Sequence, residues 1–261
     1  MSNQILRLGS KGAMVSAIQT FLLGAGFYFG GVDGQFGPKM KESVIFFQRK
    51  HGIEDDGIVG NQTLQIMVAR GLPLVTPNYD GSFPPRPDKL TPLTSNSERQ
   101  RLVGGFRYEP APEKGNPEGI RILGDWEDKN IVRFPIPQLK TLGLSDTGKV
   151  AMHRIAQVRC LALWEAWEKA GLLPRVLTYE GGWVPRFIRG SRSVLSNHAF
   201  GTAFDINYEW NQLGMVPAFK GQRGSVRELV GIANAHGWFW GGHYDSRLDG
   251  MHFELAAEAL R

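Results

Sequence analysis

The chain has 261 residues, too many for one ordinary domain and enough for two. Hydrophobic residues make up 42% and charged residues 21% of it, a globular composition that excludes an intrinsically disordered chain. The net charge of +5 favours anionic partners, but the Lys and Arg residues are scattered, which argues against a nucleic-acid-binding protein.

Cysteine and histidine content limits the kinds of metal site. The single cysteine, Cys160, excludes an internal disulfide and every zinc site built from several thiolates. Any metal must therefore be bound by histidines and carboxylates. Five of the six histidines follow residue 150, so we expect the chemistry in the second half of the chain.

The N-terminus lacks a continuous apolar segment of the kind a secretory signal needs, because Gly9, Lys11 and Gly12 interrupt it. No stretch reaches the roughly 18 apolar residues of a membrane-spanning helix. We expect a monomer made in a cytoplasm, with no membrane insertion.

Residues 5–70 predict a compact helical unit. A first apolar stripe ends at Gly24 or Gly26, and a second helix begins at Pro38, with Gly52 as a candidate cap. A third, short helix begins near Asn61. The inward positions are Val15, Ile18 and Leu22 in the first helix, Met40, Val44 and Phe47 in the second, and Leu64, Met67 and Val68 in the third.

A repeated signal separates these helices, VDGQFGPKM at 32–40 and DDGIVGNQT at 55–63. Each copy is an Asp-Gly turn, two residues, a glycine and then a helix start. Together with the opening LRLGSKG and the FFQ of the middle helix, the repeat resembles the three-helix peptidoglycan-binding module of cell-wall hydrolases. The resemblance implies that residues 1–70 bind peptidoglycan, without indicating which residues contact the glycan.

Residues 71–97 predict a semi-extended linker, because prolines concentrate there among small polar residues. These prolines are Pro73, Pro77, Pro84, Pro85, Pro87 and Pro92.

Residues 98–261 predict a second, α+β domain with a small antiparallel sheet. Short strands or extended arms are expected between 98 and 145, and strands around VLTYEG, GTAFDINYE and GMHFEL. Residues 147–170 predict a helix with a buried Cys160, and residues 225–236 predict another. The expected inward face of the first helix is Met152, Ile155, Val158, Leu161 or Ala162, and Trp164 or Ala166.

Two clusters in this domain could carry chemistry. The first is SNHAFGTAFDIN at 196–207, and the second is WFWGGHYDSRLDGMHFEL at 238–255. His198, Asp205 and His252 supply the three protein ligands that a catalytic zinc needs. Asp249 is the candidate for the carboxylate that takes a proton from the attacking water.

The pattern SxHxxGxAxD, followed by WGG and then DxMHFE, resembles the VanY-like zinc D-alanyl-D-alanine carboxypeptidase and L-alanyl-D-glutamate endopeptidase family. That resemblance implies Zn²⁺ bound by His198, Asp205 and His252, with Asp249 as general base. It also implies an upstream arginine that contacts substrate and the developing oxyanion. Arg186 is the first choice and Arg189 the second, with Arg192 as a further candidate.

Three more residues remain open in this interpretation. Ser196 is a candidate for a hydrogen bond near the metal site. His243 stands where the family commonly has an acidic residue, and it could tune the metal, contact substrate or lie on the surface. Trp238 and Trp240 are expected in the core or the cleft wall.

The two resemblances together imply a modular endolysin of phage type, which cleaves an amide bond in the peptide stem of peptidoglycan and reaches the wall after release from the host cytoplasm. An endopeptidase is favoured over a carboxypeptidase. The alternatives are a bacterial cell-wall D,D-carboxypeptidase and a catalytically inactive wall-binding protein. The bond that is cleaved and the host range stay open.

Overall fold

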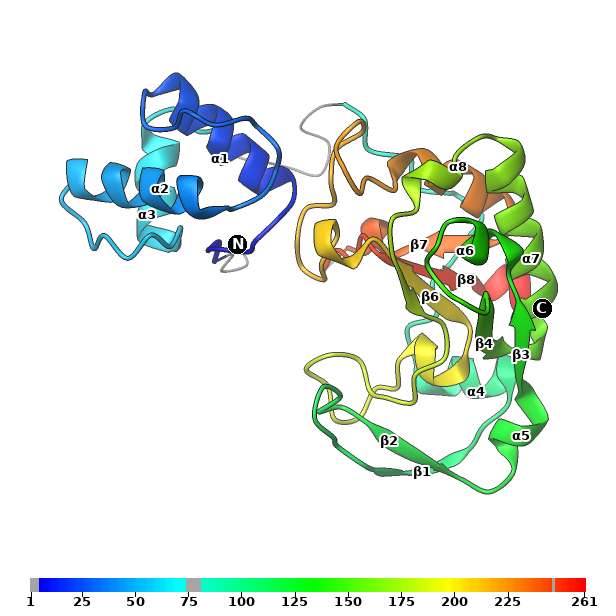
Figure 1. Ribbon diagram of the computed structural model, residues 1–261. Helices are drawn as coiled ribbons and strands as arrows, with labels where there is room; N and C mark the ends of the chain where they lie inside the picture. The colour runs from blue at the N-terminus through cyan, green and yellow to red at the C-terminus, as the bar shows by residue number, and fades with distance from the viewer. Residues whose placement is uncertain (1–4, 74–80, 246) are drawn as a thin grey trace.

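The computed structural model describes residues 5–73, 81–245 and 247–261 (Figure 1). A small helical module at the N-terminus is followed by a mixed domain of helices and short antiparallel sheets. Each part has its own buried apolar cluster. The predicted fold class, a three-helix unit followed by an α+β domain, is confirmed.

The N-terminal module contains the three predicted helices, α1 (Ala13–Gly24), α2 (Pro38–Lys50) and α3 (Asn61–Ala69). Pro38 occupies the first helical position, where its missing N–H costs no hydrogen bond. Gly52 follows α2 with φ +66°, which only glycine adopts without strain. The predicted inward residues of α1 and α2 are all buried, whereas Leu64 and Val68 of α3 are half-buried.

The repeat in the sequence corresponds to a repeated hydrogen-bond network. Gln19 of α1 donates through Nε2 to Asp33 Oδ1 at 2.8 Å and accepts the N–H of Gly34 at 2.8 Å. Gln48 of α2 donates to Asp56 Oδ1 at 2.9 Å and accepts the N–H of Gly57 at 2.9 Å. Each Asp-Gly turn is therefore held by a buried glutamine of the helix before it. The FFQ motif supplies the second of these glutamines.

Part of the predicted linker, residues 74–80 with Pro77, lies outside the described residues. Residues 81–95 contain no helix or strand. They end at the hydroxyl of Ser95, which accepts the N–H of Glu98 at 3.2 Å and caps helix α4 (Asn96–Val103).

Residues 104–145 contain the antiparallel pair β1-β2, two short helices and strand β3, which pairs with β4 further along the chain. Strand β1 pairs with β2, and the predicted extended segment at 130–139 becomes strand β3 and helix α6. The elements are β1 (Arg107–Pro110), β2 (Ile120–Leu123), α5 (Trp126–Asn130), β3 (Ile131–Pro135) and α6 (Pro137–Thr141).

The predicted helix over 147–170 is wrong in its start and in its buried face. Residues Lys149–His153 form strand β4, which pairs with β3, and helix α7 is Arg154–Lys169. Val158 is 75% exposed and Ile155 is 39% exposed. The buried stripe is set instead by two large aromatic side chains, and it consists of Ala156, Cys160, Leu163, Trp164 and Trp167. The prediction of a buried Cys160 is confirmed.

A four-stranded antiparallel sheet in the order β5-β6-β8-β7 lies at the centre of the second domain. Helices α7 and α8 pack beside it, as Figure 1 shows, and Trp238 and Trp240 are fully buried in its core. The elements are β5 (Tyr179–Gly181), β6 (Ala203–Ile206), α8 (Arg227–Ala235), β7 (Trp238–Trp240) and β8 (His252–Leu255). Single 3-10 turns are found at Leu173–Arg175, Asn197–Phe200, Tyr208–Trp210, Gly241–His243 and Ala257–Leu260.

The module contacts the second domain along residues 208–222. Lys11 forms an ion pair with Glu209 and lies 5.3 Å from the ring centroid of Trp210. The amide of Gln222 donates to Ser16 Oγ at 2.8 Å. In the part of the chain that the structure describes, no helix is long and apolar enough to cross a membrane.

Candidate metal centre and active site

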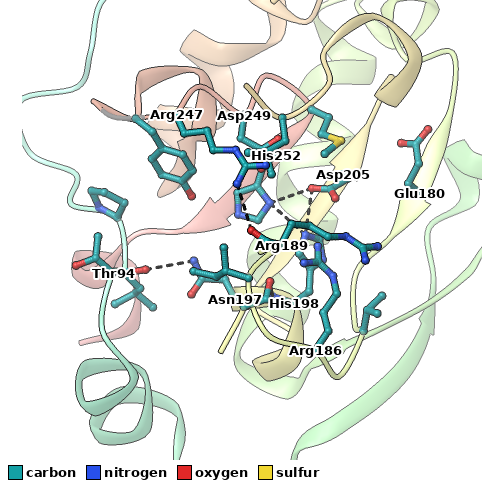
Figure 2. Close-up of a pocket in the computed structure, with 18 of the residues that line it drawn as sticks. Thr94, Glu180, Arg186, Arg189, Asn197, His198, Asp205, Arg247, Asp249 and His252 are labelled. Carbon is teal, nitrogen blue, oxygen red and sulfur yellow. Dashed lines mark hydrogen bonds and ion pairs between the residues drawn. The ribbon is translucent and has the colours of Figure 1, made fainter. Parts of the chain in front are cut away.

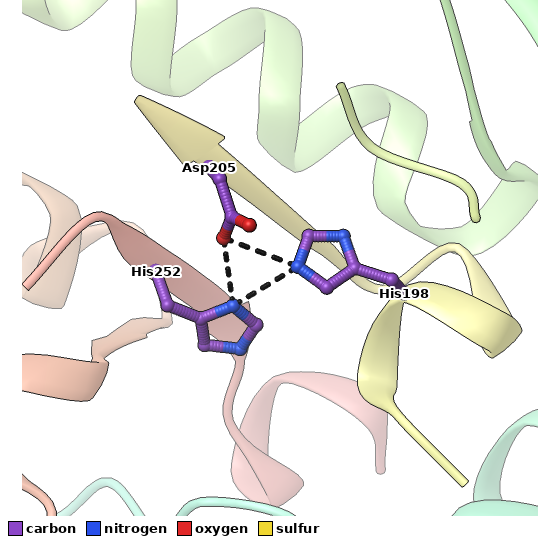
Figure 3. Close-up of side chains that lie close together, drawn as sticks. All are labelled: His198, Asp205 and His252. Atoms are coloured by element: carbon purple, nitrogen blue, oxygen red, sulfur yellow. Dashed lines mark hydrogen bonds and ion pairs between the residues drawn. The ribbon is translucent and has the colours of Figure 1, made fainter. Parts of the chain in front are cut away.

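Two neighbouring strands bring a carboxylate and an imidazole together. Strands β6 and β8 are antiparallel, and their register places Asp205 directly opposite His252. Directly opposite residues point their side chains to the same face of a sheet. Asp205 Oδ1 therefore lies 2.9 Å from His252 Nδ1 (Figure 3).

The third member, His198, comes from the 3-10 turn before β6. The hydroxyl of Ser196 accepts the N–H of His198 at 3.2 Å and fixes the start of that turn. Gly201 ends the turn with φ +68°, and a Cβ atom there would lie 2.6 Å from the backbone nitrogen of His153. The turn brings His198 Nε2 within 3.1 Å of both Asp205 Oδ1 and His252 Nδ1.

These three side chains fit a divalent transition metal. Their ligand atoms all lie within 4.8 Å of one another, and all three residues are buried. His198 donates its Nδ1–H to the carbonyl oxygen of Gly182 at 2.8 Å, which leaves the Nε2 lone pair facing the other two ligand atoms. Two imidazole nitrogens, one carboxylate oxygen and no thiolate form a donor set that suits zinc.

The charges of the cluster depend on one another. Although burial favours the neutral acid, the imidazoles of His198 and His252 hold the pKa of Asp205 well below its usual range. Burial disfavours the imidazolium of His252, but its hydrogen bond to Asp205 and the nearby carboxylate of Glu254 raise the pKa of His252 to about 10. A metal ion must therefore displace a proton from His252, so protons compete with the metal for this site.

Glu254 is a residue of the site to which the sequence analysis gave no role. It is fully buried, and within the described residues neither of its carboxylate oxygens has a hydrogen-bond partner. Its Oε2 lies 3.5 Å from His252 Nε2, the ring nitrogen that faces away from the other ligand atoms. Because His252 and Glu254 are two apart on β8, they share a face, so the HFE part of the motif could have revealed the pair.

Asp249 reaches the cluster through a tight turn that depends on a glycine. Its carbonyl accepts the N–H of His252 at 3.2 Å, and its own N–H donates to the carbonyl of Gly241 at 2.9 Å. A Cβ atom at Gly241 would lie 2.6 Å from the Asp249 carbonyl oxygen, so the WGG motif permits this close approach. Asp249 Oδ1 is buried without a partner in the described chain, and burial raises the pKa of Asp249 to about 7.

The three candidate arginines have different surroundings. Arg186 lines the cleft beside Asp205 and Asp249, and burial lowers the pKa of its guanidinium while those carboxylates oppose that shift. Its Nη1 donates to the Phe187 carbonyl at 3.2 Å, and no carboxylate of the described residues forms an ion pair with it. Arg189 also lines the cleft but is paired with Glu118 at 2.6 Å, and Arg192 is exposed and outside the cleft lining.

His243 lies apart from the metal-ligand candidates. It is buried, its Nε2 donates to the carbonyl oxygen of Pro84 at 2.9 Å, and it is not among the residues that line the cleft. Burial lowers the pKa of its imidazole. Its neighbour Tyr244 lines the cleft instead.

The cluster lies in a cleft of about 800 Å³ (Figure 2). The walls come from the segment before α4, from the loop between β5 and β6, and from the loops on either side of α8 and β7. Charged groups of both signs face it, which suits a polar, charged substrate. They are Arg86, Arg99, Glu180, Arg186, Arg189, Asp245, Arg247 and Asp249, together with Asp205.

Comparison with known protein families agrees with both halves of this description. Residues 11–67 match the family model described as a putative peptidoglycan binding domain. Residues 189–255 match the family model described as D-alanyl-D-alanine carboxypeptidase. The chain thus contains a segment similar to a peptidoglycan binding domain, followed by a segment similar to D-alanyl-D-alanine carboxypeptidases. The second match contains His198, Asp205, Asp249 and His252.

Similar proteins match over short segments. A spore cortex-lytic enzyme of Bacillus cereus is 40% identical over 67 residues, 26% of this chain and 26% of that protein. A probable N-acetylmuramoyl-L-alanine amidase of Bacillus licheniformis is 39% identical over 70 residues, 26% of this chain and 20% of that protein. The chain thus spans about a quarter or less of the length of these curated relatives.

The solved structures that this chain resembles include that of a Burkholderia AP3 phage endolysin, which is 29% identical to this chain over the matched residues. That match covers 38% of this chain and 32% of the endolysin, with a TM-score of 0.25.

Proposed function

We propose that the protein is a peptidoglycan hydrolase whose peptidase domain cleaves an amide bond in the peptide stem. The observation that carries the proposal is the buried cluster of His198, Asp205 and His252, with Asp249 beside it, in a cleft of about 800 Å³. The family match of residues 189–255 supports the same reaction class. The module, by its own family match, would hold the enzyme on the wall and raise the local concentration of substrate.

The cofactor of this proposal is Zn²⁺, which His198, Asp205 and His252 would bind. When bound, zinc supplies a Lewis acid that polarises the scissile carbonyl and activates water. Glu254 would accept the Nε2–H of His252 and so keep the Nδ1 lone pair directed at the metal.

The remaining steps belong to side chains of this chain. Asp249 would accept a proton from the attacking water and pass it to the leaving amine, because its buried carboxylate has a pKa near neutrality. Arg186 would donate to the carbonyl oxygen as negative charge develops there, since no carboxylate of the described residues forms an ion pair with it. The hydroxyl of Ser196 would keep His198 in place by accepting the backbone N–H of His198.

We favour an endopeptidase of a phage endolysin, released from the host cytoplasm to act on the wall. Digestion of purified peptidoglycan followed by mass spectrometry tests this, since a new internal N-terminus indicates an endopeptidase. Release of terminal D-alanine alone would instead identify a D,D-carboxypeptidase. Absence of any cleavage by the zinc-loaded protein would leave only a wall-binding function.

The metal and the module can be tested separately. Dialysis against a chelator should abolish cleavage and zinc should restore it, and full activity in metal-free protein would exclude the mechanism. A chain without residues 1–70 should sediment less with purified cell walls, yet still cleave a short soluble stem peptide.

A further inference from the structure

Residues 81–95, here called the strap, lie along the peptidase domain and touch it at both ends. Near the start, Arg227 donates to Ser82 Oγ at 2.8 Å and the ring of Phe83 lies 5.3 Å from that of Trp240. Near the end, the Thr91 carbonyl accepts the N–H of Ala257 at 2.9 Å, and Leu93 is 2% exposed. These contacts are those of a packed segment of the domain.

His243 is the residue of the peptidase domain that receives the strap. Its Nε2 donates to the Pro84 carbonyl at 2.9 Å, and its ring packs edge-on against Phe83 at 5.5 Å and Trp240 at 5.0 Å between centroids. The side chain is therefore held between the core and the strap. A buried imidazole that donates to a carbonyl 159 positions away fixes the relative position of two segments.

The loop 241–250, which contains His243 near its start, carries groups of the proposed active site. Tyr244 lines the cleft, with its ring centroid 6.2 Å from that of His252, and Asp249 lies near the loop's end. Between them, Asp245 forms an ion pair with Arg86 of the strap. The strap thus contacts the loop on both sides of Tyr244.

The strap also faces the cleft directly. Four of its residues line the cleft, and they are Arg86, Pro92, Leu93 and Thr94. The remaining lining residues come from the peptidase domain after residue 98.

We infer that the strap forms a wall of the peptidase cleft that is needed for full activity. His243 is a positioning residue, which anchors loop 241–250 to the strap and so holds Tyr244 and Asp249 in place. This inference rests on the proposed peptidase activity. It gives the histidine that departs from the family pattern a role away from the metal.

The test uses the full-length, zinc-loaded protein and a soluble stem peptide. His243→Phe keeps a ring but loses the donor, and we expect kcat to fall about tenfold with zinc content unchanged, because small misplacements of catalytic groups cost this much or more. His243→Gln keeps a donor near the Nε2 position and should recover most of that loss. Hydrogen exchange in peptides covering 241–250 should be faster in His243→Phe than in the wild type.

Variants on the strap side complete the test. Phe83→Ala should slow cleavage and loosen the same loop, and the double variant with His243→Phe should lose less than the product of the two single effects, since both disturb one contact. Lys89→Ala is the matched control, because Lys89 is exposed on the strap and should leave kcat and exchange unchanged.

Two results would overturn the inference. An unchanged kcat in His243→Phe and Phe83→Ala would show that the strap is structural only. Unchanged loop exchange in both variants would show that the strap does not hold loop 241–250. If the wild type cleaves nothing, the proposed function fails, whereas the exchange data still decide whether strap and loop are coupled.

Discussion

Buried polar groups occur in both domains, but among the described residues those without a hydrogen-bond partner all lie after residue 98. In the module, Gln48 uses both ends of its amide: Nε2 donates to Asp56, to the Ile58 carbonyl and to Thr63, and Oε1 accepts from Gly57. Gln19 repeats this arrangement around Asp33 and Gly34. These networks are closed, so their role is to hold the Asp-Gly turns.

In the peptidase domain, the carboxylates beside the candidate metal ligands lack such hydrogen bonds. Among the described residues, Oδ1 of Asp249 is buried without a hydrogen-bond partner, and Glu254 has only the contact of its Oε2 with His252 Nε2 at 3.5 Å, although a poorly paired buried carboxylate is costly. Two imidazole nitrogens and one carboxylate oxygen lie close together beside them. The hydrogen-bond networks of the module stabilise its fold, whereas Asp249 and Glu254 lie beside candidate metal ligands, where we expect a metal and a substrate.

The largest effect should follow removal of a ligand from the open cluster. His198→Ala should lose both bound zinc and cleavage, because two remaining ligands cannot hold a catalytic zinc. Metal analysis of the purified protein and cleavage of a stem peptide are the measurements. Retention of a full equivalent of zinc would remove His198 from the ligand set.

Asp249→Asn should keep the zinc and lose about 10²- to 10⁴-fold in kcat, the usual worth of a general base. The side chain keeps its shape, so the turn through Gly241 and His252 stays intact. Metal content and kcat are measured on the same sample. Zinc loss equal to that of His198→Ala would make Asp249 a ligand.

Glu254→Gln should weaken zinc binding about 10- to 100-fold, as expected when the partner of a metal-bound histidine is changed. Competition with a chromogenic chelator measures this without reference to activity. Glu42→Gln is the control, since Glu42 is an exposed carboxylate on α2. Equal affinity in the wild type and Glu254→Gln would show that Glu254 is only a buried acid.

The kcat/KM for cleavage should also decline as the pH falls through the pKa of Asp249, which we expect at or below about 7. Burial raises the pKa of Asp249 to about 7, and only the carboxylate above that pKa can accept a proton. A bound dication nearby would lower the value further. The measurement is kcat/KM against pH at saturating zinc, and a limb that persists in Asp249→Asn would belong to another group.

The smallest effect on catalysis should come from the closed network. Gln48→Ala leaves the N–H of Gly57 without its acceptor and removes one of the two donors to Asp56 Oδ1, and should lower the free energy of unfolding of the module by about 1–3 kcal/mol. Denaturation followed by a module-specific probe measures this. Cleavage of a soluble stem peptide should not change, and a loss of kcat would mean that the closed network also supports the active site.

Local patterns accounted for much of the molecule. The helices of the module, the buried Cys160 and the tryptophans of the core followed from apolar spacing, Pro38 and the Asp-Gly turns. The grouping of His198, Asp205 and His252 was predicted from two sequence motifs, and the strands that carry Asp205 and His252 are neighbours in the sheet. Helix α7 shows the limit, because pairing of residues 149–153 with β3 took over the start of the expected helix.

The sequence by itself determined the elements and the residue types of the site, because turns, caps and apolar periodicity act within a few positions of the chain. Only the tertiary structure decided which polar groups are buried without partners, which arginine is free of a carboxylate, and that His243 meets Pro84. These depend on side chains far apart in the sequence, whose contact is set by packing of the whole domain rather than by any local pattern.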